Sequence, residues 1–334
     1  MDFRQMLSDE ALKNELLARS DELAAAASST DGLEGLEGGI SSDLIESAAE
    51  SMAEGRWESA NPGLEAIIRR FTRPVYLIQR GAIVPPKDRA PHSKEIERRL
   101  DAARIRLSQV IPSTGRIDLR NHDLEWVGTG WVVGPRVVVT NRHVAEQFAR
   151  QGSAGFGFRY DHRGRRMSAY LDWQAEYGQP AESRFRVEAV IWIEPDDGPD
   201  VALLRIAGQS EEGEPPPAAI ALMTADEIRQ LGVGAWVAVI GYPASDSRHP
   251  EPDLKRIFDG IYDYKRLAPG RIMSFAGDGE LHHDASTLYG SSCSVVVDLA
   301  SGKAVGLHYA GEKSDRNYAV LAPQVSRIVT TRAN

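Results

Sequence analysis

The stretch WVGTGWVVGPRVVVTNRHVAEQFA, residues 126–149, holds two short apolar runs joined by a Gly-Pro turn. WVGTGWVV and RVVVT are rich in β-branched and aromatic residues, which predicts two short strands. The second run ends at Thr140, and a short helix is expected to begin near His143. An imidazole is thereby placed at the end of a rigid element, although a lone histidine is more often an ordinary surface or core residue.

Similar short β-rich runs, punctuated by glycine and proline, occur from Ile117 onward. They do not alternate with long helices, and no repeat of fixed period is visible. This pattern predicts a mainly β barrel or sandwich rather than a parallel α/β sheet. The further predicted strands are VEAVIWI, VALLRIA, AWVAVIGYP, RIMSF, SVVVD, AVGLHYA and YAVLA.

The N-terminal part of the chain has a different sequence pattern, typical of helices rather than strands. Residues 3–27 carry apolar side chains at helical spacing, and shorter helices are expected at about 42–54 and 62–71. We therefore expect a small acidic helical module over residues 1–70. One strand over 73–86 and an amphipathic helix over 92–111 would form a second region, 71–115, that packs on a β-rich domain spanning 116–334.

Composition excludes several classes of protein. The 334 residues are 42% hydrophobic, enough to bury a large core. One cysteine, Cys293, cannot form an intramolecular disulfide or a cysteine-rich metal site, which favours a cytoplasmic location. The chain shows neither a secretory signal nor an apolar stretch long enough to span a membrane, so no membrane partner is expected.

The net charge of −9 is unevenly distributed. Residues 1–60 contain 14 Asp and Glu against 4 Lys and Arg, a net charge of −10, which leaves about +1 for the rest of the chain. The acidity belongs to the N-terminal module. Nucleic acid is not an expected partner, because no basic patch is available to bind it.

A carboxylate directly precedes one predicted strand. In IEPDDGPDVALLRIAG, residues 193–208, Asp196 and Asp197 fit the chemistry of a Pro-Gly turn. Asp200 directly precedes the apolar run, and a charge that leaves water there requires a partner.

A third segment, TLYGSSCSVVVD at 287–298, places a glycine two residues before a serine. Gly290 allows the backbone to fold so that two amide N–H groups converge on one point, as an oxyanion requires, and Ser292 is the serine that fits. Base, acid and nucleophile then follow in the order His143, Asp200, Ser292 on three segments that each adjoin a strand.

With these three segments, the sequence resembles the trypsin-like serine peptidases, in the bacterial, disulfide-free branch that includes the glutamyl endopeptidases. The resemblance covers roughly residue 115 to the C-terminus and implies two six-stranded β-barrels with the active site between them. His143 would be the general base, Asp200 would orient it, and Ser292 would attack a peptide carbonyl in a protein or peptide substrate; Gly290 and Ser292 would form the oxyanion hole. No metal or cofactor is implied. The motifs that carry the resemblance are GTGWVV at 128–133, TNRHVA at 140–145, DVALLRI at 200–206, VIGYP at 239–243, HDASTLYGSSCS at 283–294 and VGLHYAG at 305–311.

The family also suggests where a substrate side chain would lie. Thr287, five residues before the nucleophile, and His308 on the following strand would face that side chain, together with the segment Tyr309, Ala310 and Gly311. A hydroxyl and an imidazole without a carboxylate suit an acidic or small polar residue better than a lysine or arginine.

The turn around Ser292 departs from the family pattern, which is usually Gly-Asn-Ser-Gly-Ser or Gly-Asp-Ser-Gly-Gly. Ser291 replaces the Asn or Asp, and Cys293 replaces the following glycine. Cys293 is expected to be a small buried filler, with a redox or regulatory role as the alternative. A peptidase-like binding or scaffold protein with an inactivated site is therefore the alternative function. The helical module is expected to recruit or restrain the protease through a protein partner, in a stress or defence response.

Two other site types fit less well. An α/β-hydrolase elbow needs Gly-x-Ser-x-Gly and the order Ser, acid, His, whereas this chain has Ser294 in the last place of the motif. A metal site at the adjacent His282 and His283 is disfavoured because neighbours on an extended segment point opposite ways. We expect these two histidines at a pocket rim or on the surface.

Overall fold

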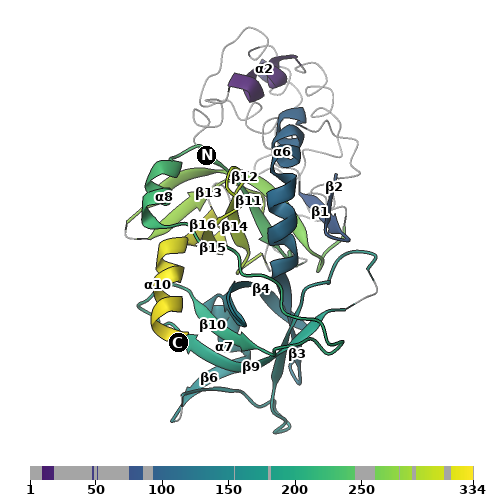
Figure 1. The fold of residues 1–334 in the computed structure, drawn as a ribbon, viewed down its shortest axis with the longest axis vertical. Coiled ribbons are helices and arrows are strands. Elements are labelled where there is room, and N and C mark those ends of the chain that lie inside the picture. Colours follow the sequence, from purple (N-terminus) through teal and green to yellow (C-terminus); the bar gives the residue numbers. More distant parts are fainter. Residues whose placement is uncertain are drawn as a thin grey trace.

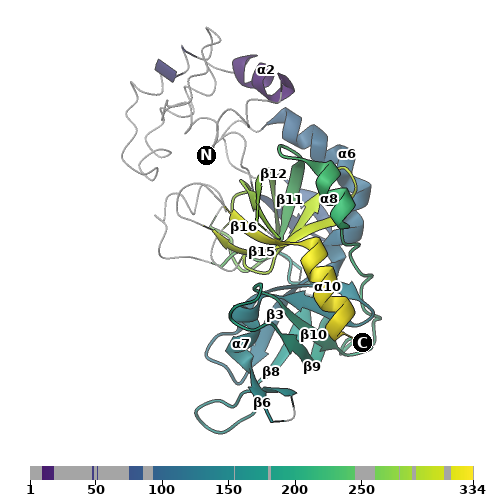
Figure 2. The same cartoon turned by 90° about the vertical axis from the view of Figure 1, so that its left-hand side faces the viewer.

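The structure is a computed structural model that describes residues 10–18, 47–48, 51, 75–85, 93–153, 155–179, 182–244, 260–277, 279–287, 291–311 and 317–333. In this part of the chain, two antiparallel barrels lie one above the other in Figures 1 and 2. Of the expected N-terminal helices, the one at 62–71 lies outside the described residues, and only 47, 48 and 51 of the second are described.

Six strands close the first barrel, in the order β10-β5-β4-β3-β8-β9. The four Val and Thr residues of β5 are all buried, as expected for a strand inside a closed barrel. Their pairing with β10 is regular, with Val139 opposite Leu203 and Thr140 opposite Ala202. The strands are β3 (Thr114–Arg120), β4 (Trp126–Gly134), β5 (Val137–Thr140), β8 (Ser168–Asp172), β9 (Arg184–Ile193) and β10 (Ala202–Ile206).

The second barrel has the order β11-β14-β15-β16-β13-β12 and closes because β12 pairs back with β11. The predicted mainly β fold with two six-stranded barrels is confirmed. The strands are β11 (Trp236–Gly241), β12 (Arg266–Ala276), β13 (Glu280–His283), β14 (Val295–Asp298), β15 (Ala304–Gly311) and β16 (Asn317–Leu321).

The expectation of a single strand over 73–86 is wrong. The chain forms a hairpin of β1 (Tyr76–Gln79) and β2 (Ala82–Val84) instead, and β1 adds to the edge of β12. Arg80 and Gly81 make the turn with φ values of 51° and 71°. Glycine takes such values readily, and Gly81 was the local signal for a turn.

Helix α6 (Lys94–Val110) confirms the expected amphipathic helix over 92–111 and runs along the second barrel in Figure 1. Ser93 caps its first turn, since its hydroxyl accepts a hydrogen bond from the amide of Ile96 at 3.1 Å. Near its C-terminal end, Arg106 donates to the carbonyl of Leu299 at 3.1 Å, just after β14. Leu100 and Leu107 belong to the same buried cluster as residues of both barrels.

The N-terminal end of α6 is also capped from elsewhere in the chain. Glu15, on helix α2 (Glu10–Ala18), accepts hydrogen bonds from the amides of Lys94 at 2.5 Å and Glu95 at 2.8 Å, and from the Ser93 hydroxyl at 3.3 Å. A carboxylate at this position satisfies amides that have no partner within the helix, and it complements the helix dipole. The described part of the N-terminal region is thereby attached to α6.

A buried cation holds the region where α6 ends. The ammonium group of Lys265 donates to the carbonyls of Ile111 at 3.1 Å and Trp173 at 2.6 Å, and to Glu176 Oε1 at 3.3 Å. The other oxygen of Glu176 accepts from the amide of Gly81 at 2.8 Å. Burial lowers the pKa of Lys265, while Glu176 opposes that effect. These contacts join α6, both barrels and the β1–β2 hairpin at one point.

Several shorter elements were not expected from the sequence. The hairpin of β6 (Ala149–Gly152) and β7 (Gly155–Phe158) projects from the first barrel. The helix before it, α7 (Arg142–Phe148), confirms the short helix expected near His143. Helix α8 (Ala225–Leu231) precedes β11. Helix α10 (Ala322–Arg332) packs on β15 and β16, and the carbonyl of Ala333 after it accepts from Arg205 of the first barrel at 3.3 Å. Figure 2 shows α10 reaching from one barrel toward the other.

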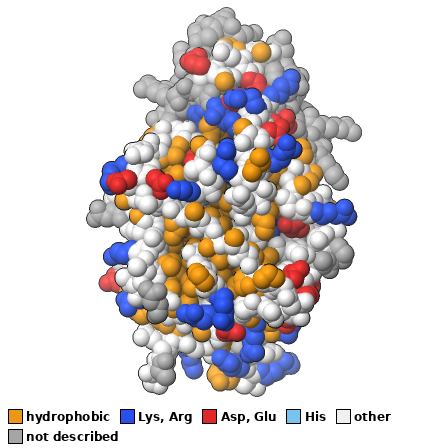
Figure 3. Space-filling view, in the orientation of Figure 1, with side chains coloured by type: hydrophobic (Ala, Val, Ile, Leu, Met, Phe, Trp, Pro, Cys, Tyr) orange, Lys and Arg blue, Asp and Glu red, His pale blue; other side chains and the backbone are white. Residues whose placement is uncertain are grey.

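Hydrophobic side chains are spread across the middle of the face shown in Figure 3. Large apolar residues are exposed at separate places, such as Ile105 on α6 at 78% and Leu124 at 51%. Scattered exposure of this kind is normal for a folded protein. No helix among the described residues is long and apolar enough to cross a membrane.

Candidate active site

The pairing of β5 with β10 brings His143 and Asp200 together, because each lies just beyond the paired ends Thr140 and Ala202. His143 is the second residue of α7, and its Nδ1 lies 2.6 Å from Asp200 Oδ2. The amide of His143 donates to the other carboxylate oxygen at 3.1 Å. With Nδ1–H donating to the carboxylate, the opposite ring nitrogen, Nε2, is the one that can accept a proton.

Further contacts hold the Asp200 segment against the start of α7. The side-chain amide of Asn141 donates to the carbonyl of Asp200 at 2.7 Å. Arg142 donates to the carbonyls of Pro195 at 2.6 Å and Gly198 at 3.1 Å. The imidazole and the carboxylate are therefore positioned through their backbones as well as through their direct contact.

The turn that carries Ser292 lies against the same region. The carbonyl of Ser292 accepts from the amide of Thr129 on β4 at 3.4 Å. The next residue, Cys293, donates its amide to the carbonyl of His308 at 2.8 Å, and its Sγ accepts from the amide of Asn141 at 3.2 Å. The predicted nucleophile thus adjoins the segment that carries the predicted base, and its side chain is half-buried. Gly290 lies outside the described residues.

Cys293 occupies an unusual backbone conformation. Its φ of 72° lies in the left-handed region, where glycine is favoured. The thiol is fully buried, as expected for a small filler, and burial raises its pKa to about 12. A protonated thiol at neutral pH is a poor nucleophile.

Comparison with known proteins identifies the family of this chain. The family described as the trypsin-like peptidase domain matches residues 128–307, more than half of the chain. The chain belongs to this family. The match runs from β4 of the first barrel into β15 of the second and contains His143, Asp200 and Ser292.

Two curated relatives and one solved structure are similar to this trypsin-like peptidase. A probable serine protease of Lysobacter enzymogenes is 28% identical over 281 residues, which cover 76% of this chain and 70% of the relative. The uncharacterized protein y4fB of Sinorhizobium fredii is 27% identical over 192 residues, covering 56% of this chain but only 25% of y4fB. The crystal structure of an inactive mutant form of Rv3671c from M. tuberculosis aligns with a TM-score of 0.42 at 21% identity, covering 68% of this chain and 90% of that one.

The residues expected to contact a substrate lie on two segments of the peptidase domain. The hydroxyl of Thr287 hydrogen-bonds to the side chain of Asn317, which in turn donates to the carbonyl of Ala285 at 2.7 Å. A Cβ added to Gly311 would lie 3.7 Å from the Thr287 hydroxyl, so the end of β15 is close to Thr287. Thr287 also lines a small cavity, together with Val75, Val239, Gly241, Pro243, Arg266, Ala268, Ser286, Ser291 and Ser294.

His308 is buried at 2% exposure and faces another histidine. Its Nδ1 lies 3.3 Å from Nε2 of His283, with ring centroids 5.3 Å apart. Burial and then the positive charge that His143 can carry lower the pKa of His308 to about 4. At neutral pH the His308 side chain is therefore an uncharged imidazole.

The expectation that His282 and His283 lie at a rim or on the surface is wrong. His283 is fully buried, and His282 is 7% exposed. As expected for β-strand neighbours, they face different partners, since His282 contacts Ser274 and Glu280 at 2.8 Å each. Glu280 also accepts a hydrogen bond from the Tyr309 hydroxyl, and this contact contributes to a raised pKa of Tyr309 whose largest cause is burial. Within the described ranges, no cluster of three or more His, Cys, Asp or Glu is placed to hold a metal ion.

Proposed function

We propose that this trypsin-like peptidase domain is an active serine endopeptidase that works through His143, Asp200 and Ser292. The observation that carries the proposal is the 2.6 Å contact between His143 Nδ1 and Asp200 Oδ2, with the Ser292 turn fastened to the start of α7. His143 Nε2 takes the proton of the Ser292 hydroxyl as the oxygen attacks a peptide carbonyl. It then gives that proton to the leaving amine, and water hydrolyses the acyl-enzyme by the reverse sequence.

Asp200 supports this cycle by stabilising the imidazolium that forms when His143 accepts the proton. The backbone amides of Gly290 and Ser292 stabilise the oxyanion of the tetrahedral intermediate. One such donor is typically worth roughly 3 kcal/mol of transition-state stabilisation.

The proposed substrate preference is an acidic side chain before the cleaved bond, as in the bacterial glutamyl endopeptidases that the sequence resembles. Thr287 and His308 contact that side chain, and the chain from Tyr309 through Ala310 to Gly311 pairs with the substrate backbone. The hydroxyl of Thr287 lies beside the end of this segment, which supports a shared binding surface.

The proposed organisation keeps residues 1–70 as a regulatory module, 71–115 as a packing region and 116–334 as the protease, located in the cytoplasm. The contacts of Glu15 with the first turn of α6, and of Arg106 with Leu299 just after β14, support a role of the N-terminal region in control. A protein partner in a stress or defence response would act through this module.

Labelling with a fluorophosphonate tests the activity. Purified protein is treated with the reagent, and its intact mass is measured for wild type, Ser292→Ala and the neighbouring control Ser291→Ala. We expect one adduct on wild type and on Ser291→Ala, and none on Ser292→Ala. Folded wild-type protein that takes no adduct, with or without a partner of the module, contradicts the proposal and favours the inactive binding or scaffold protein.

A further inference from the structure

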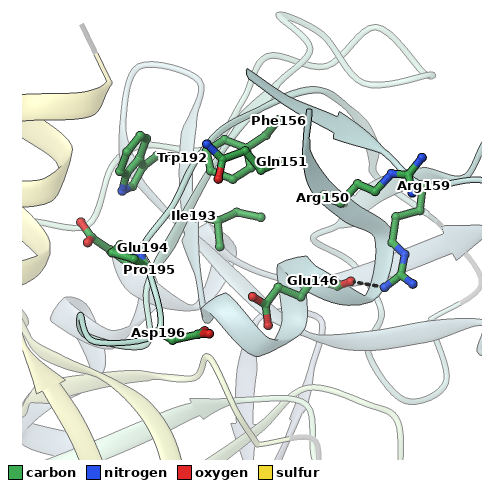
Figure 4. A pocket seen from close by; sticks show the side chains of 11 residues that line it. Glu146, Arg150, Gln151, Phe156, Arg159, Trp192, Ile193, Glu194, Pro195 and Asp196 are labelled. Atoms are coloured by element: carbon green, nitrogen blue, oxygen red, sulfur yellow. Dashed lines mark hydrogen bonds between the residues drawn. The ribbon is translucent and has the colours of Figure 1, made fainter. Parts of the chain in front are cut away.

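A cleft of about 780 Å³ lies beside the candidate active site, between the β6–β7 hairpin and the loop that joins β9 to β10 (Figure 4). None of its lining residues has a role in the proposed reaction. They include Glu146, Arg150, Phe156, Arg159, Trp192 and Ile193.

The walls of the cleft belong to the two segments that present His143 and Asp200. Glu146 lies on α7 three residues after His143, which is about one helical turn away. The loop with Pro195 leads directly to Asp200, and Arg142 fastens it to α7 through the carbonyl of Pro195 at 2.6 Å. A polypeptide bound in the cleft would therefore contact the elements that hold the base and its orienting acid.

The middle of the cleft is apolar. Ile193 lies near the centre of the view, with Phe156 above it and Trp192 above it and to the left (Figure 4). The two aromatic rings meet edge to face with centroids 5.7 Å apart, and Arg332 of α10 stacks on Trp192 with its guanidinium carbon 3.7 Å from the ring centroid. This support from both sides makes a rigid surface for a bulky apolar side chain.

Charge is divided between the two ends of the cleft. Arg150 and Arg159 lie together at one end, Glu194 and Asp196 lie toward the other, and Glu146 lies between them with its carboxylate directed toward Asp196 (Figure 4). Arg159 is held in place by a 2.8 Å hydrogen bond to the carbonyl of Glu146. A ligand that fits must place a negative group at the first end, an apolar group in the middle and a positive group at the second end.

We propose that this cleft docks an extended segment of the protein substrate that carries an acidic, an apolar and a basic side chain in succession on one face. In an extended chain every second side chain points the same way, so the matching pattern is Asp-x-Leu-x-Lys or its reverse. The identity of the occupant as substrate rests on the proposed peptidase function. The cleft shares no lining residue with the segment proposed to contact the side chain at the cleaved bond, Thr287 and His308 to Gly311, so it would add selection among protein substrates.

Binding to Ser292→Ala tests the docking site without requiring turnover. The probes are fluorescein-labelled peptides with the patterns Asp-x-Leu-x-Lys and Lys-x-Leu-x-Asp, measured by fluorescence anisotropy. We expect one of the two to bind, and its affinity to fall about tenfold or more with Arg150→Glu and with Phe156→Ala. The control Arg163→Glu reverses the charge of an exposed arginine that does not line the cleft, and it should leave affinity unchanged.

A charge exchange sharpens the test. Replacing the acidic residue of the binding peptide by lysine should weaken its binding to Ser292→Ala. The same lysine peptide should bind again when the protein also carries Arg150→Glu. Failure of both peptides to bind, or binding that Arg150→Glu does not change, overturns the proposal. Fluorophosphonate labelling separates the two proposals, since wild type that takes the adduct while the peptides do not bind retains the peptidase function and loses the docking cleft.

Discussion

The amide of Asn141 donates a hydrogen bond to Sγ of Cys293 at 3.2 Å. The residue after the proposed nucleophile is thus bonded to the residue that lies two before the proposed base. In a family that usually has glycine at the position of Cys293, a side chain has become part of the structure that aligns the site. The thiol adds a contact that glycine cannot make, at the cost of a left-handed backbone conformation.

Cys293→Gly should be more stable than Cys293→Ala. Both variants lose the thiol and its hydrogen bond, but only alanine retains the strain of a φ of 72°, which is worth roughly 1 kcal/mol. The free energies of unfolding from denaturant titration provide the measurement. The ordinary order, with alanine the more stable, would mean that this turn relaxes when the thiol is removed.

Asp200→Asn should slow fluorophosphonate labelling of Ser292 by roughly 10³- to 10⁴-fold while the protein stays folded. An amide at this position no longer selects the tautomer in which His143 Nε2 is the acceptor. Asp197→Asn is the matched control, because Asp197 is an exposed carboxylate of the same loop. Equal labelling rates for the two variants would remove Asp200 from the mechanism.

Lowering the pH from 7 to 4 should destabilise the protein through His308. Its pKa is about 4 in the folded state against an ordinary 6.5, so the unfolded chain binds the proton more tightly between these values. Stability is therefore lost as pH falls, by about 3 kcal/mol. In His308→Gln, the difference in unfolding free energy between pH 7 and pH 4 should shrink by about that amount; an unchanged difference assigns the effect to other groups.

Glu15→Gln should loosen the start of α6 without affecting the barrels. The neutral amide is a weaker acceptor for the amides of Lys94 and Glu95, and it loses the favourable charge interaction with the helix dipole. Hydrogen exchange at residues 94–97 should accelerate, roughly in line with a loss of 1 kcal/mol. Asp101→Asn, an exposed change within α6, serves as control, and equal exchange in both variants would show that Glu15 does not cap the helix.

Peptide substrates that differ only in the residue before the cleaved bond should be cleaved faster after Glu than after Arg or Lys. The neutral imidazole of His308 can donate one N–H hydrogen bond to a carboxylate, and neither His308 nor His283 offers a negative charge to a cation. Thr287→Ala should lower kcat/KM for the Glu peptide more than for an Ala peptide. Preferential cleavage after Arg would reject acidic specificity while leaving the nucleophile in place.

Much of the fold could be predicted because both barrels depend on local patterns. Runs such as RVVVT and SVVVD are β-branched throughout, and their strands are fully buried. The helix over 92–111 was equally clear from its apolar spacing. The apolar run over 73–86 predicts one strand, whereas Gly81 allows the turn of the hairpin at 76–84. Thr224 and Glu227 form a capping box, which is the local signal for α8.

The contacts within the site were harder to predict. The order of His143, Asp200 and Ser292 suggested three segments that work together, and the 2.6 Å contact between His143 and Asp200 agrees with that expectation. The contacts of Cys293 with Asn141 and of His283 with His308 join residues from separate strands and loops, so neither appears in a local pattern. Only the three-dimensional closure of the barrels creates them.

The strand order also determines when the site can form during synthesis. The first barrel is complete once β10 has been made, so His143 and Asp200 can pair while the rest of the chain is still being translated. The second barrel cannot close until β16 has emerged, because β16 joins β13 to β15. The Ser292 turn depends on the carbonyl of His308 in β15. A ribosome-bound chain therefore carries the proposed base and acid well before it carries an ordered turn for the proposed nucleophile, and the proposed chemistry would be absent from the growing polypeptide.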